Sequence, residues 1–264
     1  MIEYLGYACA LGMGIILGLT GGGGAIMTVP ILVYVVGLNP IIAAAYSLFI
    51  VGTTAAFGTI QNIKNGNVMI KTGLLFAFPS LIGVYISRMF LIPLIPDVLL
   101  RFDGVILTSR LVLLTLFAII MIFAALPMIR DRKEPDNATP AVYHKFWMPV
   151  QLFFAGVLVG LVGAGGGFLF IPLLIFVAKL PIRKAAATSL MIIAINSLIG
   201  FTGDLSNLIM DWKFLFVFTI FSVIGIYSGI YLNKFVNEKR LKTGFGYFVL
   251  VMAAYILIKE ILLT

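Results

Sequence analysis

The chain has 264 residues, of which 62% are hydrophobic and 11% are charged, with a formal net charge of +8. About a quarter of a soluble domain is charged, so this composition excludes a soluble globular protein and indicates an integral membrane protein. The lipid bilayer is therefore an expected partner, and a nucleic acid is not.

The first apolar stretch covers residues 4–36 and is interrupted by the segment GLTGGGGA at residues 18–25. Each glycine costs a helix about 1 kcal/mol, and a break at membrane depth leaves backbone N–H and C=O groups that water cannot satisfy. Two interpretations stay open. Small residues allow neighbouring helices to pack closely in membranes, whereas a deliberate helix break can turn its freed amides toward a ligand.

Three uninterrupted apolar stretches follow, at residues 40–60, 68–92 and 104–127. Each reaches the roughly 20 residues that a helix needs to cross a hydrocarbon core of about 30 Å. Membrane barrels are excluded because their strands alternate apolar and polar residues, and these stretches are apolar throughout. We therefore expect an all-α, polytopic fold. The charged, proline-containing segment at residues 130–145 is typical of a linker outside the membrane.

The second half repeats the first at an offset of 142 residues. Its own broken stretch, residues 146–179, carries the segment GLVGAGGG at residues 160–167, and further spans follow at 182–202, 212–233 and 243–262. Identical residues recur at equivalent positions, for example Ser47 and Ser189, so the chain is an internal duplication. It divides into a first repeat at residues 1–128, a linker at 129–146 and a second repeat at 147–264.

The distribution of lysine and arginine indicates how the two repeats are oriented. If each glycine-broken stretch enters the membrane and returns on the same side, most basic residues collect on one face of the bilayer; if each stretch crosses once, they divide almost evenly. Cytoplasmic segments are enriched in lysine and arginine, which favours the hairpin. The prediction is two inverted repeats, each a glycine-broken re-entrant hairpin plus three transmembrane helices. The protein would lie in the plasma membrane with a cytoplasmic linker and both termini outside.

In inverted repeats the tips of the two hairpins approach the midplane of the membrane from opposite faces. The helix after each tip presents its N-terminus, whose unpaired N–H donors and positive potential favour an anion. Glycine lets the ligand approach the backbone closely. The predicted substrate-binding residues are Gly21, Gly22, Gly23, Gly24 and Ala25 at one tip, and Gly163, Gly165, Gly166 and Gly167 at the other. Such a site needs no metal and no other cofactor.

Four polar residues in the spans after the hairpins are further substrate-binding candidates: Ser47, Thr188, Ser189 and Asn196. Their side chains suit hydrogen bonding to a sulfo or carboxylate group. Serine and threonine also bond to the carbonyls of their own helix, so both interpretations stay open.

Two arginines, Arg88 and Arg110, are the only basic residues well inside predicted spans. A charge inside the membrane marks a candidate functional site. Both arginines lie near enough to a span end to snorkel to the interface, and we expect them to do so. Asn62 and Asp204 end predicted spans and are expected at the interface as well.

Several motifs together resemble the TauE/SafE family: the glycine-rich hairpin at the start of each half, the prolines that follow (Pro30 and Pro172), the Ala-Xaa-Ser motifs ending at Ser47 and Ser189, and the basic central linker. The resemblance covers about residues 5–262. It implies a membrane permease for a small sulfur-containing anion such as sulfite, a sulfonate, sulfoacetate or thiosulfate. Ala164 departs from an unbroken glycine run, which leaves open whether both tips contribute equally.

The residues and the resemblance together predict a secondary transporter that works by alternating access around a midplane anion site. A passive anion channel is the alternative within transport. An intramembrane enzyme acting on lipid phosphates would need positioned acids, bases or a metal, and the spans lack clusters of Asp, Glu, His and Cys. We therefore expect no enzyme activity. The anion, the direction of transport, a coupling ion (H⁺ or Na⁺) and a homo-oligomeric state stay open.

Overall fold

The computed structural model describes residues 2–96, 98–102, 105–129, 147–163, 165–205, 208, 210–233, 235–236 and 238–262. The helices of the first half are α1 (Ile2–Thr20), α2 (Gly24–Pro30) with its π-helical continuation η1 (Ile31–Val35), α3 (Pro40–Lys64), α4 (Ile70–Ile86) with a second π-helical stretch η2 (Ser87–Leu91), and α5 (Ser109–Ile129). Those of the second half are α6 (Trp147–Val162), α7 (Gly167–Phe176), α8 (Ile182–Asp204), α9 (Trp212–Leu232) and α10 (Glu238–Leu262).

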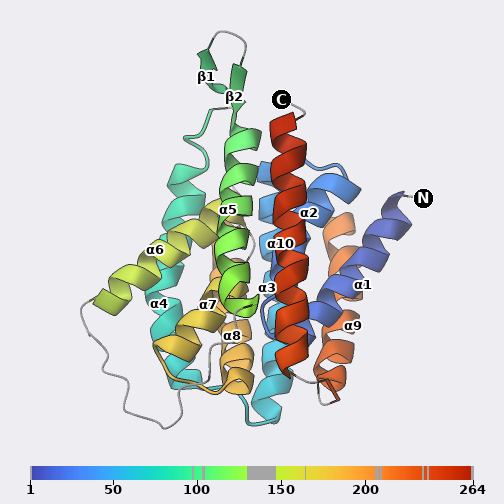
Figure 1. The fold of residues 1–264 in the computed structure, drawn as a ribbon, viewed down its shortest axis with the longest axis vertical. Coiled ribbons are helices and arrows are strands. Elements are labelled where there is room, and N and C mark those ends of the chain that lie inside the picture. The colour runs from blue at the N-terminus through green and yellow to red at the C-terminus, as the bar shows by residue number, and fades with distance from the viewer. Residues whose placement is uncertain are drawn as a thin grey trace.

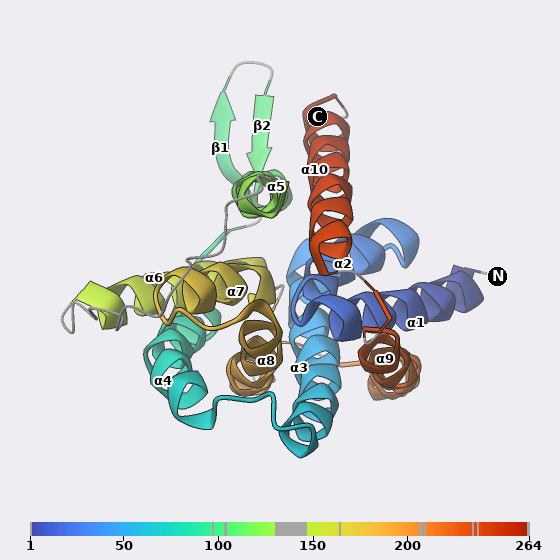
Figure 2. The same cartoon turned by 60° about the horizontal axis from the view of Figure 1, so that its bottom comes forward.

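Helices make up nearly the whole described fold, which confirms the all-α prediction (Figure 1). The helix α3, the pair α4 and η2, and the helices α8 and α9 are each long and apolar enough to cross a membrane. The exception is an antiparallel hairpin of β1 (Val98–Phe102) and β2 (Val105–Thr108), which projects beyond the helices (Figure 1, Figure 2). The span expected at residues 104–127 therefore begins as a strand and becomes helical only at Ser109. The predicted linker lies, apart from Ile129, outside the described residues.

Each glycine-broken stretch folds into a helical hairpin. In the first, the start of α1 lies beside the end of η1, since a methyl group added at Gly6 would lie 3.5 Å from Val36. The Thr20 hydroxyl accepts the N–H of Gly23 at 2.9 Å where α1 ends. In the second hairpin, α6 and α7 share one buried apolar cluster. We call residues 20–24 the first turn, and residues 163 and 165–167 the second turn.

Each hairpin packs against a helix of the other half of the chain. Helix α1 packs against α9 of the second half, and α6 packs against α4 of the first. Both contacts are close, because a methyl group at Gly14 would overlap the carbonyl oxygen of Ser222, and one at Gly156 would overlap that of Ser80. These residues are equivalent at the 142-residue offset, so the duplication extends to the packing. At these two glycines the close-packing interpretation holds.

Equivalent helices of the two halves run antiparallel where they meet. Helix α3 packs along α8, with Gly52 beside Leu198 and Gly200 beside Leu48. Helices α5 and α10 also lie side by side and run in opposite directions (Figure 1). Equivalent helices that pack antiparallel are related by an axis perpendicular to them, which is the arrangement that inverted repeats produce. Their orientation in the membrane stays a prediction.

The central core lies between α1, α3, α8 and α9 and includes Leu17, Val51 and Ile193. Many large apolar side chains face outward instead; Phe78 is 69% exposed and Phe123 is 70% exposed. An apolar surface of this extent is unfavourable in water but suits contact with lipid.

Candidate functional site

The two glycine turns contact each other inside the molecule. A methyl group added at Gly167 would lie 2.6 Å from the Cα of Gly22, and one added at Gly22 would lie 2.9 Å from the Cα of Gly167. Carbon atoms in contact are normally about 3.5–4 Å apart, so only glycine permits this approach. Ala25, just after the first turn, is buried in the central core. The structure thus brings together the two segments that the sequence singles out.

Four glycines of the two turns have a left-handed backbone. Their φ angles are 74° at Gly21, 73° at Gly163, 65° at Gly165 and 71° at Gly166. Residues with a Cβ adopt this region at a cost of about 1–2 kcal/mol. Gly23, with a φ of −66°, has an ordinary helical backbone instead. The turns therefore depend on glycine for their conformation as well as for their close approach.

Polar groups of the first turn are bonded within the protein. The Ser189 hydroxyl donates to the Gly21 carbonyl at 2.5 Å and lies 2.8 Å from the Ala186 carbonyl of its own helix. The side-chain amide of Asn233 donates to the carbonyl of Leu19. Ser189 therefore holds the first turn in this conformation, and its contact with a substrate stays a prediction.

At the second turn several buried donors are unpaired among the described residues. Ser47, the counterpart of Ser189, lies one helical turn after Ala44, the α3 residue that contacts Gly163. The Ser47 hydroxyl is fully buried and has no hydrogen-bond partner in the described part of the chain. The Ser197 hydroxyl is likewise unpaired within that set and would lie 3.2 Å from a methyl group at Gly165. In the described segments no hydrogen bond reaches the N–H groups of Gly165 and Gly166. Leaving buried donors unpaired is costly, so this cluster suits a ligand that accepts hydrogen bonds.

A buried arginine reaches the second turn. Arg88, in η2, is 0% exposed, and its Nη2 would overlap a methyl group added at Gly163. Its Nη1 lies 3.4 Å from Oδ2 of Asp204, whose side chain is 3% exposed. The expectation that Arg88 snorkels to the interface is therefore wrong, and so is the expectation that Asp204 lies at the interface. The site contains a charged side chain that the sequence analysis named as a candidate but expected to point toward the interface.

This ion pair occupies only one of two equivalent places. At the 142-residue offset, Arg88 corresponds to Ile230 and Asp204 corresponds to Asn62. Burying two charges costs several kcal/mol per ion before their attraction is counted. Because the fold builds the equivalent region without charge, the pair is not needed to form the architecture. Comparing these two pairs of positions is the sequence signal that could have identified it.

The neutral hydrogen bonds between helices of the two halves, in contrast, are duplicated. Thr54 is hydrogen-bonded to Ser222 at 2.9 Å, and the equivalent Asn196 donates to Ser80 at 2.8 Å. The Oδ1 of Asn196 is buried and has no partner in the described part of the chain. The Thr188 hydroxyl accepts a hydrogen bond from the backbone N–H of Met69, just before α4, at 3.0 Å. Asn196 and Thr188 thus link helices, and a contact of either with substrate stays a prediction.

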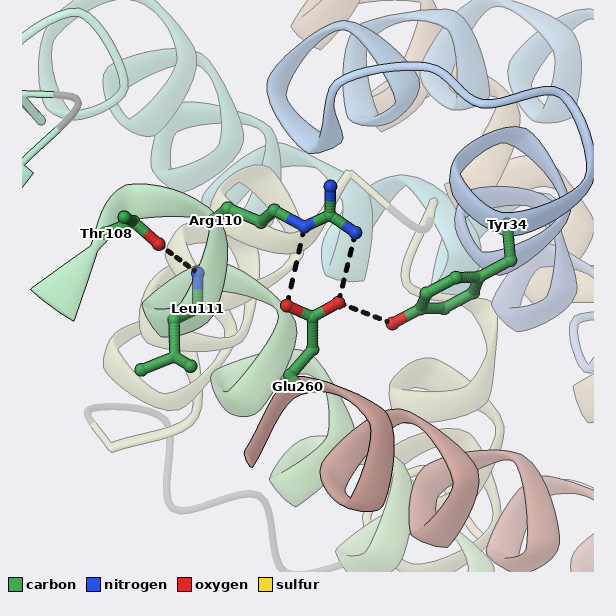
Figure 3. Close-up of polar contacts among 5 residues, drawn as sticks. All are labelled: Tyr34, Thr108, Arg110, Leu111 and Glu260. Carbon is green, nitrogen blue, oxygen red and sulfur yellow. Dashed lines mark hydrogen bonds and ion pairs between the residues drawn. The ribbon is translucent and has the colours of Figure 1, made fainter. Parts of the chain in front are cut away.

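A second ion pair joins Arg110, near the start of α5, to Glu260, near the end of α10 (Figure 3). The Nη2 of Arg110 lies 3.2 Å from Oε1 of Glu260, which also accepts the hydroxyl of Tyr34 at 3.1 Å. The Arg110 side chain is 50% exposed, as expected for a residue near a span end. The ion pair joins α5 to α10, and the hydrogen bond from Tyr34 joins η1 to α10. Among the described residues, no group of three His, Cys, Asp or Glu side chains could hold a metal ion.

Comparison with known proteins points to one family. The family model described as "Sulfite exporter TauE/SafE" matches residues 6–256. A "Probable membrane transporter protein" of Xylella fastidiosa (strain 9a5c) is 30% identical over 251 residues, which are 93% of this chain and 91% of the relative. The "Probable membrane transporter protein YunE" of Bacillus subtilis (strain 168) is 27% identical over 252 residues, covering 84% of this chain and 83% of the relative. No solved structure matches.

Proposed function

Because the chain belongs to the sulfite exporter TauE/SafE family and is a membrane transporter, we propose that it carries a small sulfur-containing oxyanion by alternating access around the second turn. The observation that carries this proposal is the buried Arg88 beside Gly163, in a turn whose Gly165 lies near the unpaired hydroxyl of Ser197. Family and relatives are transporters, which argues against an enzyme.

The donors at the second turn fit the oxygens of a sulfo or sulfite group. A guanidinium presents N–H groups in a planar fork that matches oxyanions, and such charge-assisted hydrogen bonds are about twice as strong as neutral ones. The hydroxyls of Ser47 and Ser197 and the N–H groups of Gly165 and Gly166 add neutral donors from other directions. Sulfite, sulfonates, sulfoacetate and thiosulfate all carry several acceptor oxygens on one small centre, so they are the substrates we propose.

The symmetry of the fold supports the alternating-access part of the proposal. A binding site held between two inverted halves can open to either face when one half rocks against the other. The antiparallel packing of α3 with α8, and the contact between the two turns at Gly22 and Gly167, are what such an arrangement needs. We propose a plasma-membrane location with a cytoplasmic linker and both termini outside.

Membrane topology can be tested at two equivalent exposed positions, Asn39 before α3 and Pro181 before α8. In a Cys9→Ser background, Asn39→Cys and Pro181→Cys should react with a membrane-impermeant maleimide from opposite faces of the membrane. Labelling is measured in right-side-out and inside-out vesicles. If both positions label from the same face, the halves are parallel and the alternating-access proposal loses its symmetry argument.

Counterflow in proteoliposomes tests the proposed function and separates a carrier from a channel. Vesicles containing the purified protein are preloaded with unlabelled sulfite, thiosulfate, sulfoacetate or taurine, and uptake of the same labelled compound is followed. We expect transient accumulation of the labelled compound above equilibrium for at least one of the three anions. A channel would equilibrate label without such an overshoot, and no uptake with any of the four would contradict a sulfur-oxyanion substrate.

A further inference from the structure

The ion pair of Arg88 and Asp204 points to the coupling ion. We propose, on the basis of the proposed anion site, that the Asp204 carboxylate pairs with Arg88 when no substrate is bound. When the anion displaces this carboxylate from Arg88, the carboxylate takes up one proton. Each anion would then cross the membrane together with one proton.

The contact between the two side chains is loose for a buried ion pair. Nη1 and Oδ2 are 3.4 Å apart, whereas charge-assisted N–H···O bonds are about 2.7–2.9 Å long. Within the described residues, Nε and Nη2 of Arg88 make no hydrogen bond, and Nη1 faces only Oδ2 of Asp204. The guanidinium therefore keeps its donors free for an incoming oxyanion, and the carboxylate is held by attraction across a short gap.

Charge balance at the buried site explains why a proton would accompany the anion. Without substrate, the positive Arg88 and the negative Asp204 compensate each other. An oxyanion that binds the guanidinium leaves the carboxylate with no compensating charge in surroundings of low polarity, where the neutral acid is favoured. The proton bonds to a carboxylate oxygen on arrival with the anion, and it leaves again when the anion departs on the other side.

No other ionisable group competes for this proton among the described residues. In the described segments, Arg88 is the one charged group that interacts electrostatically with Asp204, and Asp204 is the one that interacts with Arg88. The contacts that Arg88 makes with neighbouring elements are with uncharged residues, Gly203 of α8 and Gly163 of the second turn, and Ala44 of α3 also lies at Gly163. In the other half, Ile230 and Asn62 stand at the equivalent positions, so we place the coupling in one half only.

Proton uptake by the purified wild-type protein is the primary test. Thiosulfate is a suitable probe because its own charge does not change between pH 5.5 and pH 8. Titration calorimetry in buffers of different ionisation enthalpy should show about one proton taken up per thiosulfate bound. By linkage, the affinity should rise as the pH falls, by up to about tenfold per pH unit.

The variant Asp204→Asn should bind thiosulfate without proton uptake and with an affinity that does not depend on pH, because the amide neither competes for Arg88 nor titrates. Glu260→Gln is the matched control, since it removes a carboxylate that pairs with Arg110 and Tyr34, which belong to neither turn (Figure 3). It should keep the wild-type proton uptake.

The possible results separate this inference from the proposed function. Wild-type protein that binds thiosulfate without proton uptake would overturn the coupling and leave the anion site standing. An absence of thiosulfate binding in wild-type protein and both variants would contradict the anion site itself. Should Asp204→Asn fail to fold, the proton stoichiometry of the wild-type protein decides alone.

Discussion

Replacing Arg88 by isoleucine and Asp204 by asparagine together should abolish anion binding and leave the protein at least as stable as wild type. The double variant places at the second turn the residues that stand at the equivalent positions of the other half, Ile230 and Asn62. A hydrogen bond to a charged group contributes about 1.5–3 kcal/mol, and 1.4 kcal/mol is a factor of ten. Losing two such bonds should weaken thiosulfate binding by at least about 100-fold.

Stability should change in the opposite sense to binding. Replacing a buried ion pair by uncharged residues is often neutral or stabilising by about 1–4 kcal/mol, whereas removing one partner costs about 3–5 kcal/mol. Arg88→Ile alone should therefore melt well below the double variant in detergent. Thermal unfolding and thiosulfate titration on the same samples provide both measurements. A double variant that binds like wild type would place the anion site away from Arg88.

Alanine at Gly14 or at Gly156 should destabilise the protein, while alanine at Gly12 should not. A methyl group at Gly14 would overlap the backbone of α9, and one at Gly156 would overlap that of α4, so the helices must separate. Overpacking of this kind costs about 1–3 kcal/mol. Gly12, two residues away in α1, has nothing within 4 Å of the same position, and alanine there should stabilise by up to about 1 kcal/mol.

Unfolding in detergent, followed by circular dichroism, compares the three variants. Folded protein of each variant should still bind thiosulfate, because none of these glycines belongs to the turns. Equal stability of Gly12→Ala and Gly14→Ala would mean that α1 and α9 are not in the close contact described here. Loss of binding without loss of stability would assign Gly14 or Gly156 to the site instead.

The glycine turns themselves combine the two interpretations that the sequence left open. Gly165 and Gly166 have a left-handed backbone and N–H groups without partners in the described segments, which suits a ligand. A methyl group at Gly165 would also lie 2.7 Å from Val51, and one at Gly166 would overlap Val159. Alanine at these positions would disturb packing and site together. The charged pair is therefore the cleaner place to test the site.

The features of this protein that depend on local composition can be read from the amino-acid sequence. Long apolar stretches form helices in any arrangement that satisfies their backbone away from water. Runs of glycine end a helix wherever they occur, and a repeat at a constant offset requires two similar units. The position of each turn and the helical class follow from these properties. The hairpin is favoured over a single crossing by the distribution of lysine and arginine. The family resemblance also follows from the sequence, and the match over residues 6–256 confirms it.

Differences between equivalent residues of the two halves depend on how the helices pack in three dimensions. Ser47 and Ser189 occupy the same position of the duplication, yet one hydroxyl is unpaired among the described residues and the other holds the Gly21 carbonyl. An arginine near the end of a span can extend to the membrane interface or point into the protein. The apolar sequence around Arg88 is compatible with either direction. Its direction depends on a partner at position 204, in the other half of the chain. Pairing over such a separation follows from how the helices pack, because neither composition nor periodicity records which side chains meet.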